Sequence, residues 1–318
     1  MWLNIAFIII GIVLVLWGAD RLTDGAVAIA ERMNVPQIVI GLTIVAVGTS
    51  APELCVSLVS ALKGTADLAV GNVVGSNIFN SMLIVGVAAM VAPMTILPST
   101  VRKDIPFSLV ASISLATMIL MDGDISRLDA AILFAAFLLF MFITVKGAKG
   151  SHAEEDAEPK NYSPLKATFF ILLGLACLIV GSNVFVFGAT EVAAALNVSD
   201  AVIGLTIVAG GTSLPELATS VVSARKGQSG IAIGNVLGSN VFNILMILGL
   251  TGLICPMEVQ GITFIDLSIL VGSMFLLWLF SYTKYTVARW EGAVLTAIFL
   301  AYMGWLVYRA TTPLPSLG

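Results

Sequence analysis

The sequence predicts an all-α integral membrane protein with ten transmembrane helices in two inverted five-helix repeats. Three observations predict this fold: the composition, the long apolar runs and an internal duplication. Of the 318 residues, 58% are hydrophobic and 11% are charged, whereas charged residues make up about 25% of an ordinary soluble domain. A soluble chain of this size could not bury so much apolar surface. The apolar runs are continuous rather than alternating, which indicates helices and not a barrel.

Ten apolar runs have the length of a membrane-spanning helix, which needs about 20 residues. In chain order they are 3–25, 36–62, 68–93, 104–121, 128–146, 165–189, 201–224, 230–254, 262–282 and 291–309. The polar stretch 147–164 separates the fifth run from the sixth, and we interpret it as a solvated linker rather than a regulatory cation site. It divides the chain into the halves 1–146 and 165–318.

The basic residues predict the orientation, because Lys and Arg gather on the cytoplasmic side of a membrane protein. With the N-terminus outside and ten alternating spans, 12 of the 15 basic residues fall on the cytoplasmic side. Lys63, Arg127 and Arg309 fall outside. We therefore expect the linker 147–164 in the cytoplasm.

A duplication relates the two halves. Residues 39–94 align without a gap to residues 202–257 at an offset of 163, and 33 of the 56 positions are identical. Because each half contains five spans, an odd number, the second half must enter the membrane the opposite way round. The sequence thus predicts an inverted repeat with a pseudo-two-fold axis in the membrane plane.

Each repeat carries one glutamate in the middle of an apolar run, Glu53 and Glu216. A carboxylate near the bilayer centre costs about 3 kcal/mol or more, so it indicates an ion or proton path. Pro52 and Pro215 precede these glutamates, and a proline removes one helical hydrogen bond. We expect both helices to break here. The break should free backbone carbonyls to line a cavity; the candidates are those of Ala46, Thr49, Ala209 and Thr212.

All candidate ligand atoms in these motifs are oxygens. Besides the two carboxylates, hydroxyl and amide oxygens come from Ser50, Ser76, Asn80, Ser213, Ser239 and Asn243. Oxygen ligands select hard cations and disfavour zinc and copper. Two carboxylates neutralise one Ca²⁺, and neutral oxygens suit Na⁺.

The paired Gly-Thr-Ser-x-Pro-Glu and Gly-Asn-x-x-Gly-Ser-Asn-x-x-Asn motifs resemble the alpha-repeats of the cation/Ca²⁺ exchanger superfamily, sodium/calcium exchanger type. The resemblance implies alternating-access exchange of Na⁺ for Ca²⁺ in a prokaryotic inner membrane, without a cofactor or an obligatory protein partner. It implies cation sites between broken helices 2, 3, 7 and 8. By position it implies carboxylate ligands at Glu53 and Glu216, carbonyl ligands at Thr49, Thr212, Ala46 and Ala209, hydroxyl ligands at Ser50, Ser213, Ser76 and Ser239, and amide ligands at Asn80 and Asn243.

The resemblance also implies that the first and sixth spans slide as a pair across the core. Both spans contain glycines, and we expect these small residues to let the pair slip along the core.

Three other functions remain as alternatives. A Ca²⁺/H⁺ antiporter would keep the fold, but proton-coupled relatives typically carry Gly-Asn-x-x-Glu where this chain has Gly-Asn-Val-x-Gly. A passive cation channel would usually form its filter by oligomerising around an axis. An intramembrane protease would need catalytic groups that the single histidine, His152, cannot supply. A net charge of −4 does not indicate the basic surface that binds nucleic acid. We expect a secondary transporter and not an enzyme.

Overall fold

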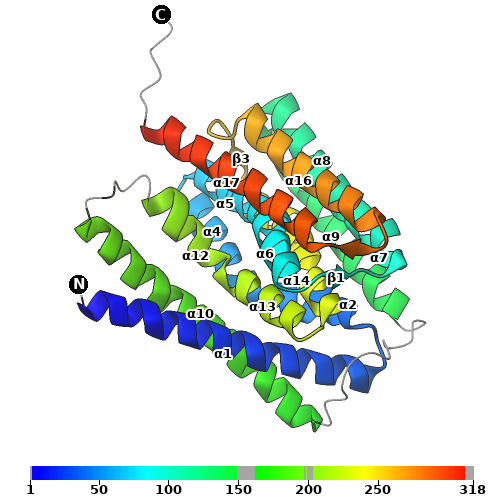
Figure 1. Ribbon diagram of the computed structural model, residues 1–318. Coiled ribbons are helices and arrows are strands. Elements are labelled where there is room, and N and C mark those ends of the chain that lie inside the picture. The colour runs from blue at the N-terminus through cyan, green and yellow to red at the C-terminus, as the bar shows by residue number, and fades with distance from the viewer. Residues whose placement is uncertain (1, 149–161, 197, 199–202, 312–318) are drawn as a thin grey trace, which may run out of the picture.

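The computed structural model describes residues 2–148, 162–196, 198 and 203–311 (Figure 1). Within these residues, eight helices are long and apolar enough to cross a membrane, and one bent pair of helices would make a ninth. The predicted segment 201–224 begins outside the described residues. Most of the predicted linker 147–164 also lies outside them. Ten spans therefore stay a prediction.

Helices make up nearly all of the described chain. In order, the elements are α1 (Trp2–Met33), α2 (Gln37–Ile40), η1 (Gly41–Val45), α3 (Ala46–Thr49), α4 (Ala51–Leu62), α5 (Ala66–Ile78), η2 (Phe79–Ile84), α6 (Val85–Val91), β1 (Met94–Thr95), α7 (Pro98–Arg102), α8 (Asp104–Asp122), β2 (Asp124–Ile125), α9 (Arg127–Ala148), α10 (Pro164–Ala195), η3 (Gly204–Val208), α12 (Ala209–Thr212), α13 (Leu214–Arg225), α14 (Ser229–Val241), η4 (Phe242–Ile247), α15 (Leu248–Ile254), β3 (Met257–Glu258), α16 (Phe264–Tyr282), β4 (Thr286–Val287) and α17 (Arg289–Thr311). The elements marked η are π-helical.

Proline bends the second span as the sequence predicts. Helix α3 ends at Thr49 and α4 begins at Ala51, with an angle of 48° between the two parts of the span. The third and eighth spans differ from the prediction of broken helices. Each runs as one helix, Ala66–Val91 and Ser229–Ile254, and each contains a π-helical turn instead of a break.

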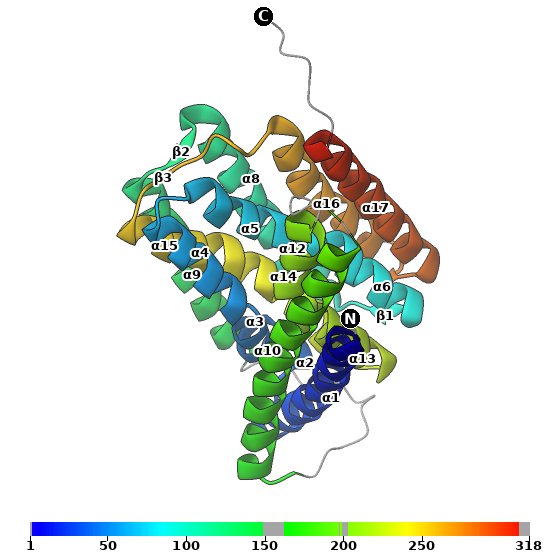
Figure 2. The ribbon, with the colours of Figure 1, turned by 90° about the vertical axis from the view of Figure 1, so that its left-hand side faces the viewer.

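Helices α1 and α10 lie side by side as a long pair along one side of the molecule (Figures 1 and 2). Glycines bring their backbones together: a Cβ on Gly18 would lie 2.8 Å from the carbonyl oxygen of Gly174, and one on Gly181 would lie 2.9 Å from that of Gly11. These glycines therefore face the partner helix. The expectation that they let the pair slip along the core is wrong, because they join the pair itself.

Two short antiparallel ladders link the halves crosswise. Strand β1 of the first half pairs with β4 of the second, and β2 of the first pairs with β3 of the second. Strands β1 and β3 lie 163 residues apart, and η1 and η2 lie the same distance from η3 and η4. The secondary structure thus follows the sequence repeat.

The centre of the fold is α14 with η4. Every residue from Gly230 to Val241 is buried. The outer helices instead expose large apolar side chains, including Phe142 on α9, Leu172 on α10 and Leu300 on α17, as expected for surfaces that face lipid.

Candidate cation site

Glu53 and Glu216 lie in the first turn of α4 and of α13, directly after the Ser50 and Ser213 corners. Proline occupies one of the first two helical positions in both helices, where its missing N–H costs nothing. Both residues are 1% exposed. Each also lies at a helix N-terminus, where the helix dipole stabilises a negative charge.

The two halves exchange hydrogen bonds at these carboxylates. The Ser50 hydroxyl donates to Oε1 of Glu216 at 3.0 Å, and the Ser213 hydroxyl donates to Oε1 of Glu53 at 3.1 Å. Ser76 on α5 extends this group, since its Oγ lies 3.2 Å from that of Ser213. The serine that precedes the glutamate-bearing helix of each repeat therefore bonds to the carboxylate of the other repeat. Both carboxylates belong to one buried polar centre.

A second layer of hydrogen bonds fixes the glutamate backbones. Asn72 donates to the Glu53 carbonyl at 3.3 Å, and Asn235 donates to the Glu216 carbonyl at 3.2 Å. Thr49 donates through its hydroxyl to Oδ1 of Asn235 at 3.0 Å. The side chain of Thr49, predicted only as a carbonyl ligand, therefore also joins the halves.

The sequence argument that the helix break frees the backbone carbonyls agrees less well with the structure. Ala46 lies in α3, and its carbonyl accepts a hydrogen bond from the Ser50 amide at 3.0 Å. It has not lost its helical partner, and the hydroxyl of Thr49 also lies within hydrogen-bond distance of it, at 3.3 Å. Ala209 and Thr212 begin and end α12, the counterpart of α3.

Asn80 and Asn243 are the second residues of the π-helical turns η2 and η4. Element η2 contacts α13, and η4 contacts α4, so each amide lies beside the glutamate-bearing helix of the opposite repeat. Asn80 donates to Oδ1 of Asn240 at 3.1 Å, and Asn243 donates to Oδ1 of Asn77 at 3.1 Å. Sequence reasoning assigned no role to Asn77 and Asn240. Their identity at the 163-residue offset was the signal available.

Several oxygens of this centre have no hydrogen-bond partner within the described part of the chain. They are Oε2 of Glu53, Oε2 of Glu216, Oδ1 of Asn80, Oδ1 of Asn243 and Oγ of Ser239. An unpaired buried polar group costs about 1–3 kcal/mol. All five belong to residues predicted as cation ligands.

The donor set suits a hard cation. Among the described residues, no group of three or more His, Cys, Asp and Glu side chains could hold one ion. The ligands beyond the two carboxylates must therefore be neutral oxygens. Such a set matches the oxygen preference of Ca²⁺ and leaves little net charge once a divalent ion is bound.

A cavity borders the site on one side. A cavity of about 470 Å³ lies between α5, η3, α16 and α17, and Asn72, Ser76 and Thr206 line it. A Cβ on Gly75 would meet no atom within 4 Å. At the equivalent Gly238, a Cβ would lie 2.6 Å from that of Ala46. Matching faces of the two repeats are thus open in one half and packed in the other.

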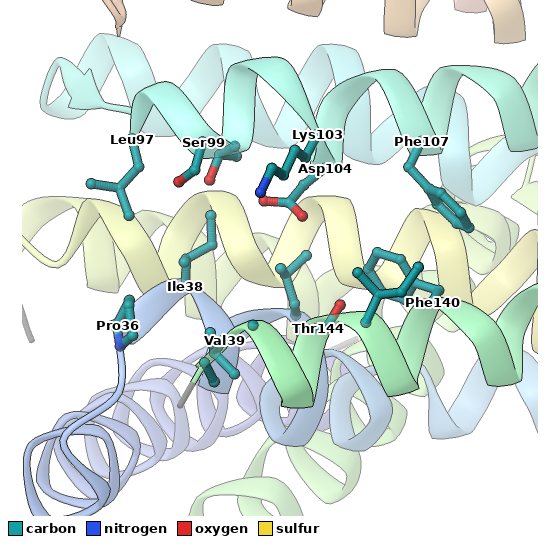
Figure 3. A pocket seen from close by; sticks show the side chains of 15 residues that line it. Pro36, Ile38, Val39, Leu97, Ser99, Lys103, Asp104, Phe107, Phe140 and Thr144 are labelled. Atoms are coloured by element: carbon teal, nitrogen blue, oxygen red, sulfur yellow. The ribbon is translucent and has the colours of Figure 1, made fainter. Parts of the chain in front are cut away.

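A second cavity of about 530 Å³ lies between α2, α7, α8 and α9. Lys103 and Asp104 point into it from the start of α8, and Phe107 and Phe140 close its far end (Figure 3). None of the predicted cation ligands lines this cavity, so it gives no path to the carboxylates in this structure.

Comparisons with known proteins match this architecture. A family model described as "Sodium/calcium exchanger protein" matches residues 3–146 and 166–308. The inner membrane protein YrbG of Escherichia coli is 37% identical over 97% of this chain and 98% of its own length. The sodium/calcium exchanger MaX1 of Methanosarcina acetivorans is 32% identical over 96% and 99%. A solved structure of the sodium-calcium exchanger NCX_Mj superposes with a TM-score of 0.84, at 31% identity over 95% of this chain and 98% of that one.

Proposed function

We infer that this chain, which belongs to the sodium/calcium exchanger protein family, exchanges Na⁺ for Ca²⁺ across a membrane by alternating access. One observation carries the proposal. Two buried carboxylates, one from each repeat, each use one oxygen for a serine of the other repeat and keep one oxygen without a partner among the described residues. Two such oxygens offer a charge of −2 to one divalent cation.

The neutral oxygens support Na⁺ as the counter-ion. Hydroxyl and amide groups from Ser50, Ser76, Asn80 and their counterparts surround the carboxylates, and they carry no proton that must leave before a cation binds. Relatives that align over nearly the whole chain are named sodium/calcium exchangers. We therefore place Na⁺ ahead of H⁺ as the coupling ion.

The unequal packing of the repeats supports alternating access. We propose that the halves 1–146 and 165–318, with motifs 39–94 and 202–257, form an inverted repeat in the inner membrane. The linker 147–164 then lies in the cytoplasm. In this topology, the cavity beside Ser76 opens to the outside, at the loop holding Gly261 and Ile262. Exchange of the open and packed faces would move access to the cytoplasm.

Flux measurements test the proposal. The purified chain in proteoliposomes is given Na⁺, K⁺ and H⁺ gradients one at a time, and Ca²⁺ uptake is followed. We expect Ca²⁺ uptake only when Na⁺ is more concentrated inside the liposomes, so that Na⁺ leaves in exchange for Ca²⁺. Uptake driven by a pH gradient alone would establish the Ca²⁺/H⁺ antiporter instead. Uptake with no counter-gradient at all would establish a channel.

A further inference from the structure

The two central amides of the site, Asn80 and Asn243, do not fix their own orientation. We propose that Asn77 and Asn240 are positioning residues that turn the oxygens of Asn243 and Asn80 toward the cation. This inference rests on the proposed function, because it assumes that a cation binds between these groups. It assigns a role to two residues that the cation-ligand set leaves out.

The orientation of Asn243 is fixed by a backbone carbonyl. The side-chain amide nitrogen of Asn77 donates to the carbonyl oxygen of Asn240 at 3.2 Å. A carbonyl oxygen can only accept, so the Oδ1 of Asn77 must face the other way. That Oδ1 accepts from Nδ2 of Asn243 at 3.1 Å. Asn243 cannot rotate its amide without placing oxygen against oxygen.

The orientation of Asn80 is fixed by a methionine sulfur. Nδ2 of Asn240 lies 2.8 Å from the hydroxyl of Ser81 and 3.3 Å from the sulfur of Met274 on α16. A thioether sulfur can only accept. The Ser81 hydroxyl donates to the same sulfur at 3.1 Å, which leaves its lone pairs for Asn240. The Oδ1 of Asn240 therefore accepts from Nδ2 of Asn80 at 3.1 Å.

Both chains of hydrogen bonds end on an oxygen without a partner. Oδ1 of Asn80 and Oδ1 of Asn243 are buried and accept no hydrogen bond in the described structure. A flipped amide would present N–H groups to the cation and remove a ligand oxygen. Since these positions are buried, water cannot compensate for a wrong orientation. Both series of hydrogen bonds run from one repeat to the other, so each repeat orients the central amide of the other repeat.

The crossing pattern gives a sharp experimental signature. If Asn77 acts through Asn243, then Asn77→Ala should cost Ca²⁺ affinity in the wild-type background but add nothing once Asn243→Ala is present. The same holds for Asn240→Ala with Asn80→Ala. The matched controls pair Asn77→Ala with Asn80→Ala, and Asn240→Ala with Asn243→Ala. No side-chain hydrogen bond joins the two members of a control pair, although Asn77 and Asn80 both bond to Asn240. The effects in a control pair should therefore combine more fully than those in a crossed pair.

Ca²⁺ binding to the full-length protein in lipid nanodiscs, measured by titration calorimetry, supplies the readout. We expect each single alanine variant to weaken Ca²⁺ binding about tenfold, the size of one lost hydrogen bond in a site of this kind. The two crossed double variants should bind no more weakly than Asn243→Ala or Asn80→Ala alone. The two control double variants should bind more weakly than either of their single variants, by up to about a hundredfold relative to the wild type.

Three results would count against the inference, and they can be told apart. A wild-type protein that binds no Ca²⁺ would overturn the proposed function and the inference with it. Normal wild-type binding with crossed pairs that multiply like the control pairs would overturn the positioning role alone. Asn77→Ser and Asn240→Ser serve where an alanine variant fails to fold, because serine is too short to bridge both partners. Unchanged affinity in these serine variants would also overturn it.

Discussion

At the scale of single residues, the two glutamates are the most demanding feature of the site. Each is buried in an apolar span, and each accepts a side-chain hydrogen bond from a serine of the opposite repeat. Removing one member of a buried, charge-compensated set leaves the rest uncompensated and costs several kcal/mol in order of magnitude. The pair should therefore tolerate no neutral substitute when the cation is divalent.

We predict that Glu53→Gln and Glu216→Gln each reduce Na⁺-driven Ca²⁺ uptake to background while the protein still folds. The amide keeps the shape of the side chain but removes one of the two negative charges that offset Ca²⁺. Uptake into proteoliposomes is the measurement. Glu258→Gln is the control, because Glu258 is exposed on β3 and should leave uptake unchanged. Near-normal uptake in both glutamate variants would show that the cation binds elsewhere.

The sequence identifies the ligands of this site better than the residues that support them. A carboxylate in an apolar run is visible without a structure, because its burial cost demands a function. The role of Asn77 is not visible. It depends on which atom of Asn240, 163 positions away, lies within hydrogen-bond distance, and only the folded chain determines that.

At the scale of elements, some features of the spans can again be predicted from the sequence and others only from the folded chain. Pro52 predicts the bend before α4 because its effect is local. The π-helical turns η2 and η4 carry no such local signal, and nothing in their apolar sequences distinguishes them from α-helix. They begin at Phe79 and Phe242, beside the amides that bond across the repeats. Single π-turns are frequent at functional sites, so we attribute these turns to the cross-repeat contacts.

The glycines between α1 and α10 allow a prediction about thermal stability, in which two glycine-to-alanine substitutions have different effects. Gly18→Ala places a Cβ 2.8 Å from a backbone oxygen, and overpacking of this kind costs about 1–3 kcal/mol. Gly304→Ala on α17 places a Cβ where no atom lies within 4 Å, and alanine is about 1 kcal/mol better than glycine in a helix. Thermal unfolding in detergent should therefore show a lower midpoint for Gly18→Ala and an unchanged or higher one for Gly304→Ala. Equal midpoints would mean that the helix pair is loosely packed.

Polar contacts hold the α1–α10 pair to α13 at one end of the molecule. Lys226 lies 2.5 Å from an oxygen of Asp20 and 3.0 Å from one of Asp24. The hydroxyls of Thr23 and Ser223 lie 2.9 Å apart. At the 163-residue offset, the counterparts of Asp20 and Asp24 on α10 are Asn183 and Phe187, which carry no charge. Ion pairs equivalent to these two cannot form at the related end, because both counterpart residues are uncharged.

We predict that Lys226→Gln shifts the protein toward the state in which this end is open. Partly exposed ion pairs contribute about 1 kcal/mol at most, so the equilibrium between access states should move by roughly fivefold. The measurement is the rate at which Leu42→Cys, in the packed interface with α14, reacts with a thiol reagent in a background without native cysteines. Lys63→Gln changes the equivalent lysine and should have no effect. Equal rates in both variants would contradict the asymmetry.

At the scale of the whole molecule, two related motifs, identical at 33 of 56 positions, have unequal surroundings. The duplication of 39–94 in 202–257 could be predicted from the sequence, and the crossed ladders β1–β4 and β2–β3 follow the same symmetry. The open face at Gly75 and the packed face at Gly238 could not be predicted. Both glycines stand in the same motif, so the difference belongs to the state of the whole chain and not to its local sequence.

The orientation of the two halves gives the last prediction. Leu62 and Arg225 end α4 and α13 at equivalent positions of the repeats, and both side chains are exposed. In an inverted repeat with five spans in each half, they must face opposite sides of the membrane, because five is an odd number. After replacement of Cys55, Cys177 and Cys255, we expect Arg225→Cys to react with a membrane-impermeant maleimide only from the cytoplasmic side, and Leu62→Cys only from outside. Intact cells and inside-out vesicles provide the two exposures, and detergent provides full reaction as the control. Reaction of both cysteines from the same side would require an even number of spans per half, and the crossed site would then need a different topology.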